Sequence, residues 1–573
     1  MVMQRYKGGR LPAAWEISVA ETIALLEADF PGMAGAVARG RYALWLGSGI
    51  SLDRVVGVPA VIGRVIEYLR SRMDAGNPTC RYKVALDQVL ANLSPPERER
   101  LHLDLPIDDW PEADRRAVTS RLAGFYAEVL ETPLEGEPDP DFLLWTAVDV
   151  PGSFTGDDPD VEHLCVVMLT LEGAFRDITS ANWDYLIEAA ENKLIGAVGT
   201  KIDVCIRAPD FQNASGRAKL LKYHGCAVRA VANSAVYRPL LIARTPQITQ
   251  YGVNAAYAVM RDHLTALVQQ RRTLMIGFSA QDTDVQHIFV HGANGSGWEW
   301  NAAPTAFLFA EDALSGGQRG ILASAYGEQY APHRPAIEES ARIRAFAKPL
   351  LLALLLTVLE LKAAALADLG LPAAWNAAER NTVKIGLRHI RDAAAMAADP
   401  ERLKFTHSLI ATMMLGLDLF HHGKSDSGRY IPLSSDPIQQ IADVPETTGL
   451  RQAAIAFALL GKGAADGDWS ISAGTAMTTP INLQQGSRVT RVFVAANDDV
   501  AGKMIQAGHV DPDADDTVLL LSTSPKARRA RSSSGPMGRT GKIGLREVCL
   551  TSMIDTATDA LDLIGAFKRS TSL

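Results

Sequence analysis

The sequence is poor in cysteine, and its cysteines are not spaced as metal ligands. The 573-residue chain has five of them, Cys80, Cys165, Cys205, Cys226 and Cys549. A structural zinc ribbon needs two Cys-x-x-Cys pairs, because four thiolates must converge on one tetrahedral ion, and this sequence contains no such pair. A zinc site is therefore not expected, and the odd number of scattered cysteines is typical of a reducing compartment.

The sequence also lacks an apolar run that is long enough to cross a membrane. Its strongest run, Pro349–Leu359, is about half of the roughly 20 residues that a span needs, and Lys348, Glu360 and Lys362 flank it closely. We interpret this run as a buried helix. The N-terminal segment is basic, but no apolar stretch follows it, so we predict no signal peptide and expect a cytoplasmic protein without membrane contact.

An excess of positive charge is missing as well. The net charge of -8 argues against a protein that generally coats nucleic acid. One local exception, Lys526–Lys542, holds six cationic residues and no acidic one. This stretch is either a solvated flexible loop or a contact for nucleic-acid phosphates, and it has no aromatic residue for base stacking.

Short apolar runs, by contrast, are frequent in the first half, where they alternate with helical stretches. The expected strands are Tyr42–Leu46, Phe175–Thr179, Ile202–Ile206, Leu220–Tyr223, Leu274–Gly277 and Ala306–Phe309. Most are apolar at consecutive positions, which indicates strands that are buried on both faces of a parallel sheet. Residues 1–340 are therefore predicted to form a doubly wound, Rossmann-like α/β domain.

The other segments differ in character. Residues 60–170 are predicted to form a helical insertion, as a lid or small lobe, and residues 341–425 a helical segment. That segment ends at His421-His422-Gly423, which we interpret as a helix C-terminus rather than a metal site. Residues 426–573 are expected to form a small α/β unit of unknown role. Its predicted elements are strands Arg491–Ala496, Thr517–Ser522 and Arg546–Leu550 and a closing helix Ile554–Phe567.

Two glycine-containing loops follow expected strands. The first is Gly47-Ser48-Gly49-Ile50-Ser51 and the second is Gly277-Phe278-Ser279. Glycines let the backbone approach a phosphate, a following helix start offers unpaired N–H groups, and serine can donate to a phosphate. The alternative is a pair of tight turns without a ligand, with an aspartate capping the next helix.

Two further loops after strands carry polar side chains. Asn182-Trp183-Asp184 can hold a ribose hydroxyl or a water, or its Asn or Asp can simply cap the next helix. His224, in the segment that ends His224-Gly225, can be a general base near neutral pH or a structural histidine. In an open α/β sheet, loops at the carboxyl ends of strands gather at one crevice, where ligands bind.

The ordered set of motifs resembles the sirtuin superfamily, in particular the bacterial sirtuin-like NADases of antiphage defence. The resemblance covers roughly residues 20–335. The elements that carry it are Gly47-Ser48-Gly49-Ile50-Ser51, Gly57-Val58-Pro59, Asn182-Trp183-Asp184, His224-Gly225 and Gly277-Phe278-Ser279.

The resemblance implies an NAD-binding, sirtuin-type domain and a role for each matching residue. Asn182 would hold a ribose hydroxyl and place a water, His224 would be the base at the nicotinamide ribose, and Asp184 would support the loop. The residues implied at the diphosphate and adenosine are Gly47, Ser48, Gly49, Ser51, Gly277 and Ser279.

Two departures from the family pattern bear on the activity. Ala181 stands where the family has Thr, although Thr179 and Ser180 lie just upstream, so one hydrogen bond is lost or rerouted. The zinc ribbon of the protein deacylases, which belongs to the lobe that shapes their acyl-lysine channel, is missing. Its absence favours water as the acceptor.

The leading hypothesis is hydrolysis of NAD⁺, with NAD⁺ as substrate, to nicotinamide and ADP-ribose. The alternatives are NAD-dependent deacylation or ADP-ribosyl transfer, and a non-catalytic sensor of NAD⁺ or ADP-ribose. An active NADase would be toxic unless restrained, and the resemblance implies regulation by homo-oligomer assembly, by a HerA-type ATPase or by an Argonaute protein. The apolar run near Pro349 is interpreted either as an oligomer interface or as an internal core helix.

Overall fold

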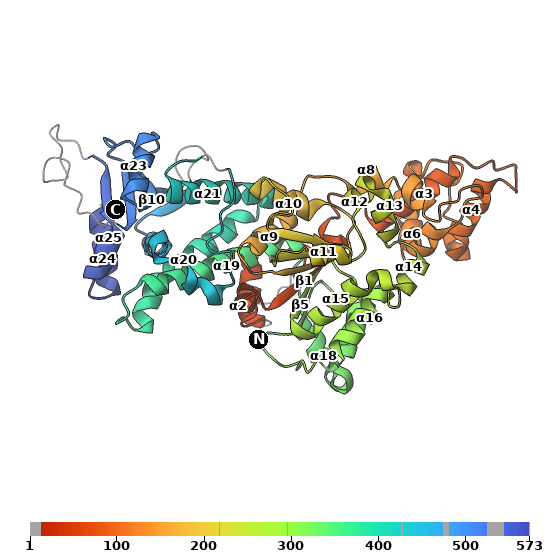
Figure 1. The fold of residues 1–573 in the computed structure, drawn as a ribbon, viewed down its shortest axis with the longest axis horizontal. Helices are drawn as coiled ribbons and strands as arrows, with labels where there is room; N and C mark the ends of the chain where they lie inside the picture. The colour runs from red at the N-terminus through yellow and green to blue at the C-terminus, as the bar shows by residue number, and fades with distance from the viewer. Residues whose placement is uncertain are drawn as a thin grey trace.

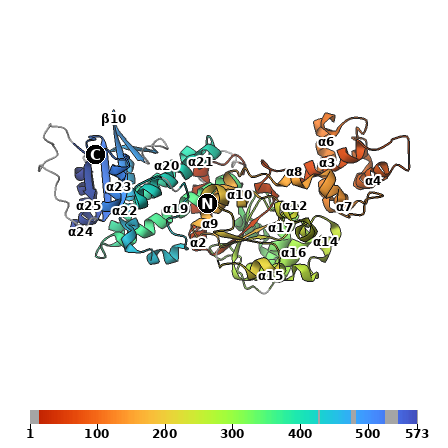
Figure 2. The same cartoon turned by 45° about the horizontal axis from the view of Figure 1, so that its top comes forward.

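The computed structural model describes residues 13–216, 218–294, 296–425, 428–473, 481–523 and 544–571. The basic stretch Lys526–Lys542 lies outside these residues. Figure 1 shows an elongated molecule with three parts in a row, and the turned view in Figure 2 keeps that order. A helical lobe around α3 (Val58–Arg70) lies at one end, a large sheet around β1 (Tyr42–Leu46) lies in the middle, and the C-terminal half ends in α25 (Ala560–Thr571).

The large sheet has seven strands in the order β3-β4-β2-β1-β5-β6-β7, and every neighbouring pair is parallel. After β1, its strands are β2 (Asp177–Ser180), β3 (Ile202–Cys205), β4 (Ala218–Lys222), β5 (Arg272–Ile276), β6 (Phe307–Ala310) and β7 (Arg342–Ile343). The predicted doubly wound parallel α/β fold is thus confirmed. The six predicted strands are present, and each begins and ends within two residues of its predicted bounds. β7 was not predicted, because two residues at the sheet edge leave no apolar run.

Helices cover both faces of the large sheet, because consecutive apolar residues point to opposite sides. Leu44 and Leu46 pack in one buried cluster, and Ala43 and Trp45 pack in another. The helices of the first face are α1 (Val19–Asp29), α2 (Met33–Ala38), α9 (Val161–Leu171), α10 (Leu186–Ile195) and α19 (Ala347–Gly370). Those of the second face are α15 (Ala258–Gln270), α16 (Thr283–Ala293), α17 (Gly316–Tyr326) and α18 (Tyr330–Ala341). Between β3 and β5 run the short helices α11 (Ala208–Gln212), α12 (Ala227–Ala232), α13 (Ser234–Tyr237) and α14 (Thr245–Gln250).

The helical lobe has a separate buried cluster, to which Ala227 and Ala230 of α12 also contribute, and residues 58–154 contain no strand. After α3, it consists of α4 (Arg81–Val89), α5 (Pro95–Arg98), α6 (Glu112–Ala123), α7 (Tyr126–Glu131) and α8 (Val150–Phe154). α9, which falls in the expected insertion 60–170, packs instead in the core of the large sheet against α10 and α19.

The C-terminal half combines long helices with a five-stranded sheet of order β12-β11-β10-β9-β8. Its helices are α20 (Ala377–Ala398), α21 (Arg402–His422), α22 (Leu450–Ala465), α23 (Asp498–Gln506) and α24 (Leu550–Thr556), followed by α25. Its strands are β8 (Ser470–Ala473), β9 (Ile481–Gln485), β10 (Arg488–Asn497), β11 (Thr517–Thr523) and β12 (Arg546–Cys549). β10, β11 and β12 are parallel, whereas β9 is antiparallel to both of its neighbours.

Two details of this half bear on the sequence predictions. The expected single closing helix Ile554–Phe567 is wrong, because the chain forms α24 and α25 with a break between them. Asp559 causes the break, since its carboxylate accepts hydrogen bonds from the N–H groups of Leu561 and Asp562, each at 2.9 Å, and so starts a new helix. α21 does end at the two histidines, with Gly423 in the left-handed conformation that the sequence predicts (φ 72°).

α19 contains the strongest apolar run and is long and apolar enough to span a membrane by length and composition alone. In this fold, 67% of its most apolar window is buried inside the protein. Two of the three charged residues that flank its apolar run, Glu360 and Lys362, are also buried, and Nζ of Lys362 lies 2.9 Å from Oε2 of the buried Glu172. α19 is therefore a core helix of this structure.

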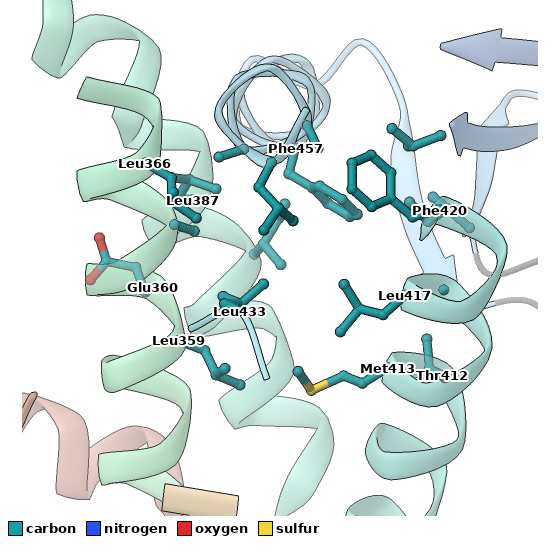
Figure 3. A pocket seen from close by; sticks show the side chains of 18 of the residues that line it. Leu359, Glu360, Leu366, Leu387, Thr412, Met413, Leu417, Phe420, Leu433 and Phe457 are labelled. Atoms are coloured by element: carbon teal, nitrogen blue, oxygen red, sulfur yellow. The ribbon is translucent and has the colours of Figure 1, made fainter. Parts of the chain in front are cut away.

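An apolar cavity of about 350 Å³ lies in the C-terminal half, and α21 forms part of its wall. Figure 3 shows side chains from α19, α20, α21 and α22 around it, among them Leu359, Leu387, Met413 and Phe457. The carboxylate of Glu360 points away from the centre of this group. We call this space the apolar cavity.

Candidate active site

A second cavity, of about 480 Å³, opens between the large sheet and the helical lobe. The loops after β1, β2, β4 and β5 form one wall, as expected where the strand order reverses beside β1, and α3, α6, α7 and α8 form the other. The predicted site residues that line this polar cavity are Gly47, Ser48, Ser51, Asn182, Asp184, His224, Gly277 and Ser279. Gly49 lies behind the wall. The sequence therefore placed its candidate residues in one location, although their roles stay predictions.

The glycines of the two loops pack against each other. A Cβ on Gly47 would lie 2.2 Å from the carbonyl oxygen of Gly277, and one on Gly49 would lie 2.6 Å from the Cα of Gly277. Gly277 itself has φ of 60°, which strongly favours glycine. The N–H groups of Gly47 and Gly49 are already used, since they donate to the carbonyls of Ile276 and Gly277 at 3.1 and 3.0 Å. These glycines are thus required by loop packing, whatever they do for a phosphate.

The loop after β1 also departs from the expected helix start. It forms a single 3₁₀ turn at Ser48–Ile50, and α3 begins only at Val58. The exposed hydroxyl-bearing residues Ser48 and Ser279 reach the cavity from the two glycine loops. Polar contacts to a bound ligand from this wall therefore fall to side chains more than to a helix N-terminus.

The amide of Asn182 has a defined orientation. Its Nδ2 donates to the carbonyl oxygen of Gly47 at 3.1 Å and to Oγ of Ser51 at 3.3 Å. A backbone carbonyl can only accept, so the nitrogen must face Gly47 and Oδ1 must point elsewhere. Asn182 lines the cavity, so Oδ1 is the acceptor that it can offer to a ribose hydroxyl or a water.

The replacement at Ala181 is compensated within the same loop. The N–H of Asn182 donates to Oγ of Ser180 at 3.1 Å. The hydrogen bond to this loop is therefore supplied by Ser180, one residue before the position where the family pattern has Thr. Asp184 caps the next helix, because its Oδ1 accepts from the N–H of Leu186 at 3.1 Å, and it lines the cavity as well.

His224 is buried at the end of β4 and is oriented by a carboxylate. Its Nε2 lies 2.8 Å from Oδ2 of the buried Asp284. Because the carboxylate accepts, Nε2 carries the proton, and Nδ1 is the basic nitrogen of the neutral ring. Burial lowers the pKa of His224, but the carboxylates of Asp284 and Asp282 outweigh it, so the pKa lies above its usual value. His224 is thus held in one orientation, with Nδ1 as the nitrogen that can accept a proton.

The polar cavity is acidic. Asp184 and Asp282 line it, and among the residues that the structure describes no lysine or arginine does. The lobe takes part through Tyr126, whose hydroxyl donates to Oδ1 of Asp282 at 3.0 Å. Burial raises the pKa of Asp282, which the nearby His224 and Tyr126 oppose. Such an environment stabilises a positively charged centre more than a negative one.

His224, Asp282 and Asp284 bring their ligand atoms within 4.8 Å of one another, which is the one such group of metal-ligand type in the described chain. The hydrogen bond between His224 and Asp284 accounts for much of this closeness. The five cysteines are free thiols. The prediction that no metal takes part stays a prediction.

Three residues of this site were not foreseen. An aspartate was expected here only as a helix cap, whereas Asp284 accepts from the N–H of Val285 at 2.8 Å and also holds His224. Tyr126 comes from the lobe, whose contacts no local pattern reveals. His163 contacts Ser51 from behind the wall, 112 residues away in sequence, and sits in an apolar helix that gives no signal of such a contact.

Comparison with known families agrees with this geometry. Residues 176–330 match the SIR2-like domain family, from just before β2 to the start of α18. SIR2-like domains are in general NAD-utilising enzymes. The match includes Asn182, His224 and the Gly277 loop, and it leaves out β1, its glycine loop and the helical lobe. No curated protein matches the chain. The match supports a sirtuin-like relationship for this part of the chain.

Proposed function

We propose that this protein is an NAD⁺ glycohydrolase, which converts NAD⁺ and water to nicotinamide and ADP-ribose. The observation that supports this most is the arrangement of Asn182 and His224 in one cavity, each held in one orientation by protein partners. Orientation of a bound reactant and of the groups around it supplies a large part of the barrier reduction in such reactions.

The proposed reaction breaks the bond between the ribose C1′ and the nicotinamide nitrogen. The electron pair of that bond goes to the nitrogen, so the cationic pyridinium leaves as neutral nicotinamide and the positive charge passes to the ribose. The carboxylates of Asp184 and Asp282 favour this oxocarbenium-like centre, and the described cavity lining holds no lysine or arginine to oppose it.

Water completes the reaction. Oδ1 of Asn182 accepts a hydrogen bond from the water or from a ribose hydroxyl and so places the oxygen near C1′. Nδ1 of His224 takes the proton that is released as the C–O bond forms, either directly or through the ribose hydroxyl. Ser48, Ser51 and Ser279 provide hydroxyl groups for the rest of the dinucleotide, with Gly47, Gly49 and Gly277 shaping the loops that carry them.

Release of nicotinamide from NAD⁺ by the purified protein, with any activator supplied, tests the proposal. We expect Asn182→Ala and His224→Ala each to lower kcat by about 100- to 10,000-fold. His291→Ala, at an exposed position on α16, is the matched control and keeps full activity. Thermal unfolding of each variant separates loss of chemistry from loss of the fold. Full activity in either site variant would refute the assigned roles.

Two other outcomes would replace this function. If NAD⁺ is consumed only when an acyl-lysine peptide is present, the acceptor is the peptide and the protein is a deacylase. If NAD⁺ binds stoichiometrically and stays intact, the domain is a sensor. Both outcomes use the same cavity, so the product analysis decides between them.

We further propose, on the family resemblance, that the protein acts as an effector of bacterial antiphage defence that is switched on by assembly or by a partner protein. In cells that carry the gene, NAD⁺ should then fall after phage infection and stay constant without it. A strain with Asn182→Ala should keep its NAD⁺ in both conditions. Depletion without infection at native expression would contradict regulated activation.

A further inference from the structure

A buried histidine stands directly behind the wall of the polar cavity. His163 lies on α9 and is fully buried, as is Ser51, and Nε2 of the histidine lies 3.2 Å from Oγ of the serine. Ser51 in turn accepts from Nδ2 of Asn182 at 3.3 Å. Ser51 therefore connects a residue that cannot touch a ligand with the residue that we assign to place the water.

The protonation of His163 is determined by its other contact. Its Nδ1 lies 3.2 Å from the backbone nitrogen of Asp160, which can only donate. Nδ1 is therefore unprotonated, and the neutral ring carries its proton on Nε2, facing Ser51. A doubly protonated ring would set two donors against each other at Asp160. Burial lowers the pKa of His163, in agreement with this neutral state.

The consequence for Ser51 is a fixed set of hydrogen bonds. Its oxygen receives one hydrogen from His163 and one from Asn182, which uses both of its acceptor positions. Because the oxygen accepts from His163, the hydroxyl hydrogen of Ser51 points away from the histidine. The nitrogen of the Asn182 amide is held toward Ser51 and Gly47, and Oδ1 is held away from them.

We propose that His163 is a positioning residue of the active site, which fixes the amide of Asn182 through Ser51. The proposal rests on the proposed function for the meaning of Asn182, but the geometry that it asserts does not depend on turnover.

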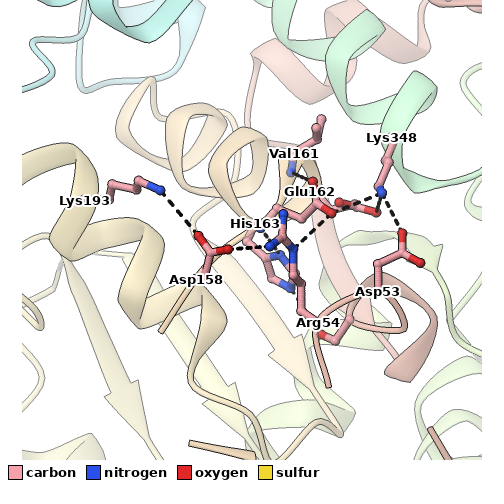
Figure 4. A network of polar contacts seen from close by, with 10 residues as sticks. Asp53, Arg54, Asp158, Val161, Glu162, His163, Lys193 and Lys348 are labelled. Carbon is pink, nitrogen blue, oxygen red and sulfur yellow. Dashed lines mark hydrogen bonds and ion pairs between the residues drawn. The ribbon is translucent and has the colours of Figure 1, made fainter. Parts of the chain in front are cut away.

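A polar network keeps His163 itself in place (Figure 4). Asp160, which is 5% exposed, begins α9 and accepts from the N–H of Val161 at 2.7 Å. Its Oδ2 also lies 3.2 Å from Nε of Arg54 and 3.2 Å from Nζ of Lys348. Arg54 belongs to the loop that carries Ser51, and Lys348 lies in the first turn of α19. The backbone N–H that orients His163 is thus fixed from both the glycine loop and the core helix.

The test compares two substitutions at His163 that differ in their hydrogen bonding. His163→Phe keeps an aromatic ring of similar size but donates nothing to Ser51, whereas His163→Gln can present an N–H there. We expect His163→Phe to lower kcat by about 10- to 100-fold with a change in KM for NAD⁺ below about threefold, and His163→Gln to recover most of the loss.

A double-mutant cycle identifies the route. If His163 acts through Ser51, the double variant His163→Phe/Ser51→Ala should be no worse than the more impaired of the two single variants. Lys193→Gln is the control within the network, because it removes only the exposed 3.7 Å contact with Asp158, and it should keep full activity. Additive losses in the cycle, or wild-type kcat in His163→Phe, would overturn the proposal.

A crystal structure tests the proposal without an activity assay. In a crystal structure of His163→Phe we expect the amide of Asn182 to leave its position against Gly47 and Ser51, and an unchanged amide would overturn the proposal. If wild-type protein fails to release nicotinamide with any activator supplied, the glycohydrolase proposal fails while this structural comparison still decides the role of His163. If His163→Phe does not fold, the same comparison is made with Ser51→Ala and His163→Gln.

Discussion

The two cavities of this protein have similar volumes, about 480 and 350 Å³, but polar groups form a substantial part of the wall only in the first. The polar cavity is formed by loops at the ends of parallel strands, and its side chains are held by hydrogen bonds to backbone groups and to buried carboxylates. The apolar cavity lies between helices and is lined by leucine, alanine, methionine and phenylalanine side chains (Figure 3). The properties of the polar cavity depend on the direction in which each polar group points. Those of the apolar cavity depend only on the volume that its side chains fill.

This difference predicts how each cavity responds to substitution. In the polar cavity a change of one atom can remove an orientation or force two loops apart, with a large effect on activity or folding. In the apolar cavity an added methyl group meets empty space and other apolar atoms, so its effect is small and can be favourable.

The largest effect is expected where the two glycine loops meet. In Gly277→Ala the new Cβ would lie 2.7 Å from the Cα of Gly49, in a residue with φ of 60°. We expect a loss of about 3 kcal/mol or more in the free energy of unfolding, since both backbone strain and a backbone clash contribute. Gly196→Ala is the control, because Gly196 has φ of 72° but no atom within 4 Å of its Cβ position, and it should lose only about 1 kcal/mol. Equal losses in chemical denaturation would show that the loops can separate without cost.

The next effect concerns the carboxylate that orients His224. Asp284→Asn has a single oxygen, so it cannot both cap α16 and accept from Nε2 of His224. We expect kcat to fall by about 10- to 100-fold. Activity should also persist to lower pH, because the base must be unprotonated and the pKa of His224 falls when a carboxylate that raises it is removed.

The pH–rate profile of Asp284→Asn, compared with Asp262→Asn at an exposed position, checks this. If kcat of Asp284→Asn falls at the same low pH as kcat of the wild type, the titration of a group other than His224 causes that fall.

A smaller and opposite effect is expected in the apolar cavity. Ala454 lies on α22 at its wall, and Ala454→Leu should raise the free energy of unfolding by about 1 kcal/mol as its added carbons fill empty space. Ala397→Leu, at an exposed position on α20, controls for helix propensity and should have no effect. Destabilisation in a thermal melt would show that the cavity is already filled or cannot accept a branched side chain.

We expect no effect on activity when metal ions are removed. The proposed mechanism uses no metal, so EDTA should leave nicotinamide release unchanged. Loss of activity with EDTA and its recovery with a divalent cation would show that His224, Asp282 and Asp284 hold an ion and that the polar cavity works differently.

Much of the central fold was predictable because each strand of the large sheet corresponds to a short local run of residues. Strands such as Tyr42–Leu46 are consecutive apolar residues between turn residues, and a parallel sheet requires that pattern. β8 and β9 were not predicted. Ser470–Ala473 of β8 alternates polar and apolar residues over only four positions and pairs with β9. The break before α25 depends on one capping aspartate within an otherwise helical pattern.

The candidate site was predictable to the extent that strand ends determine it. Asn182 and His224 follow buried strands, and parallel strands bring their carboxyl ends to one edge. The residues that orient these two side chains are distant in sequence. Asp284 lies 60 residues beyond His224, and His163 lies on α9, 112 residues from Ser51, through which it contacts Asn182. Such pairings depend on tertiary packing, which a single sequence does not encode locally.

α19 has a consequence for how such a protein can be assembled from parts in evolution. Leu350–Val358 belong to the core of the large sheet, whereas Leu366 and Ala367 belong to the core of the C-terminal half. A gene fusion that joined a different C-terminal half before Ala347 would remove α19, one of the five helices that cover this face of the large sheet. Recombination that preserves folding must instead keep α19 with the sheet and exchange only the chain beyond Gly370. Each exchanged C-terminal segment would then have to pack against the C-terminal end of α19.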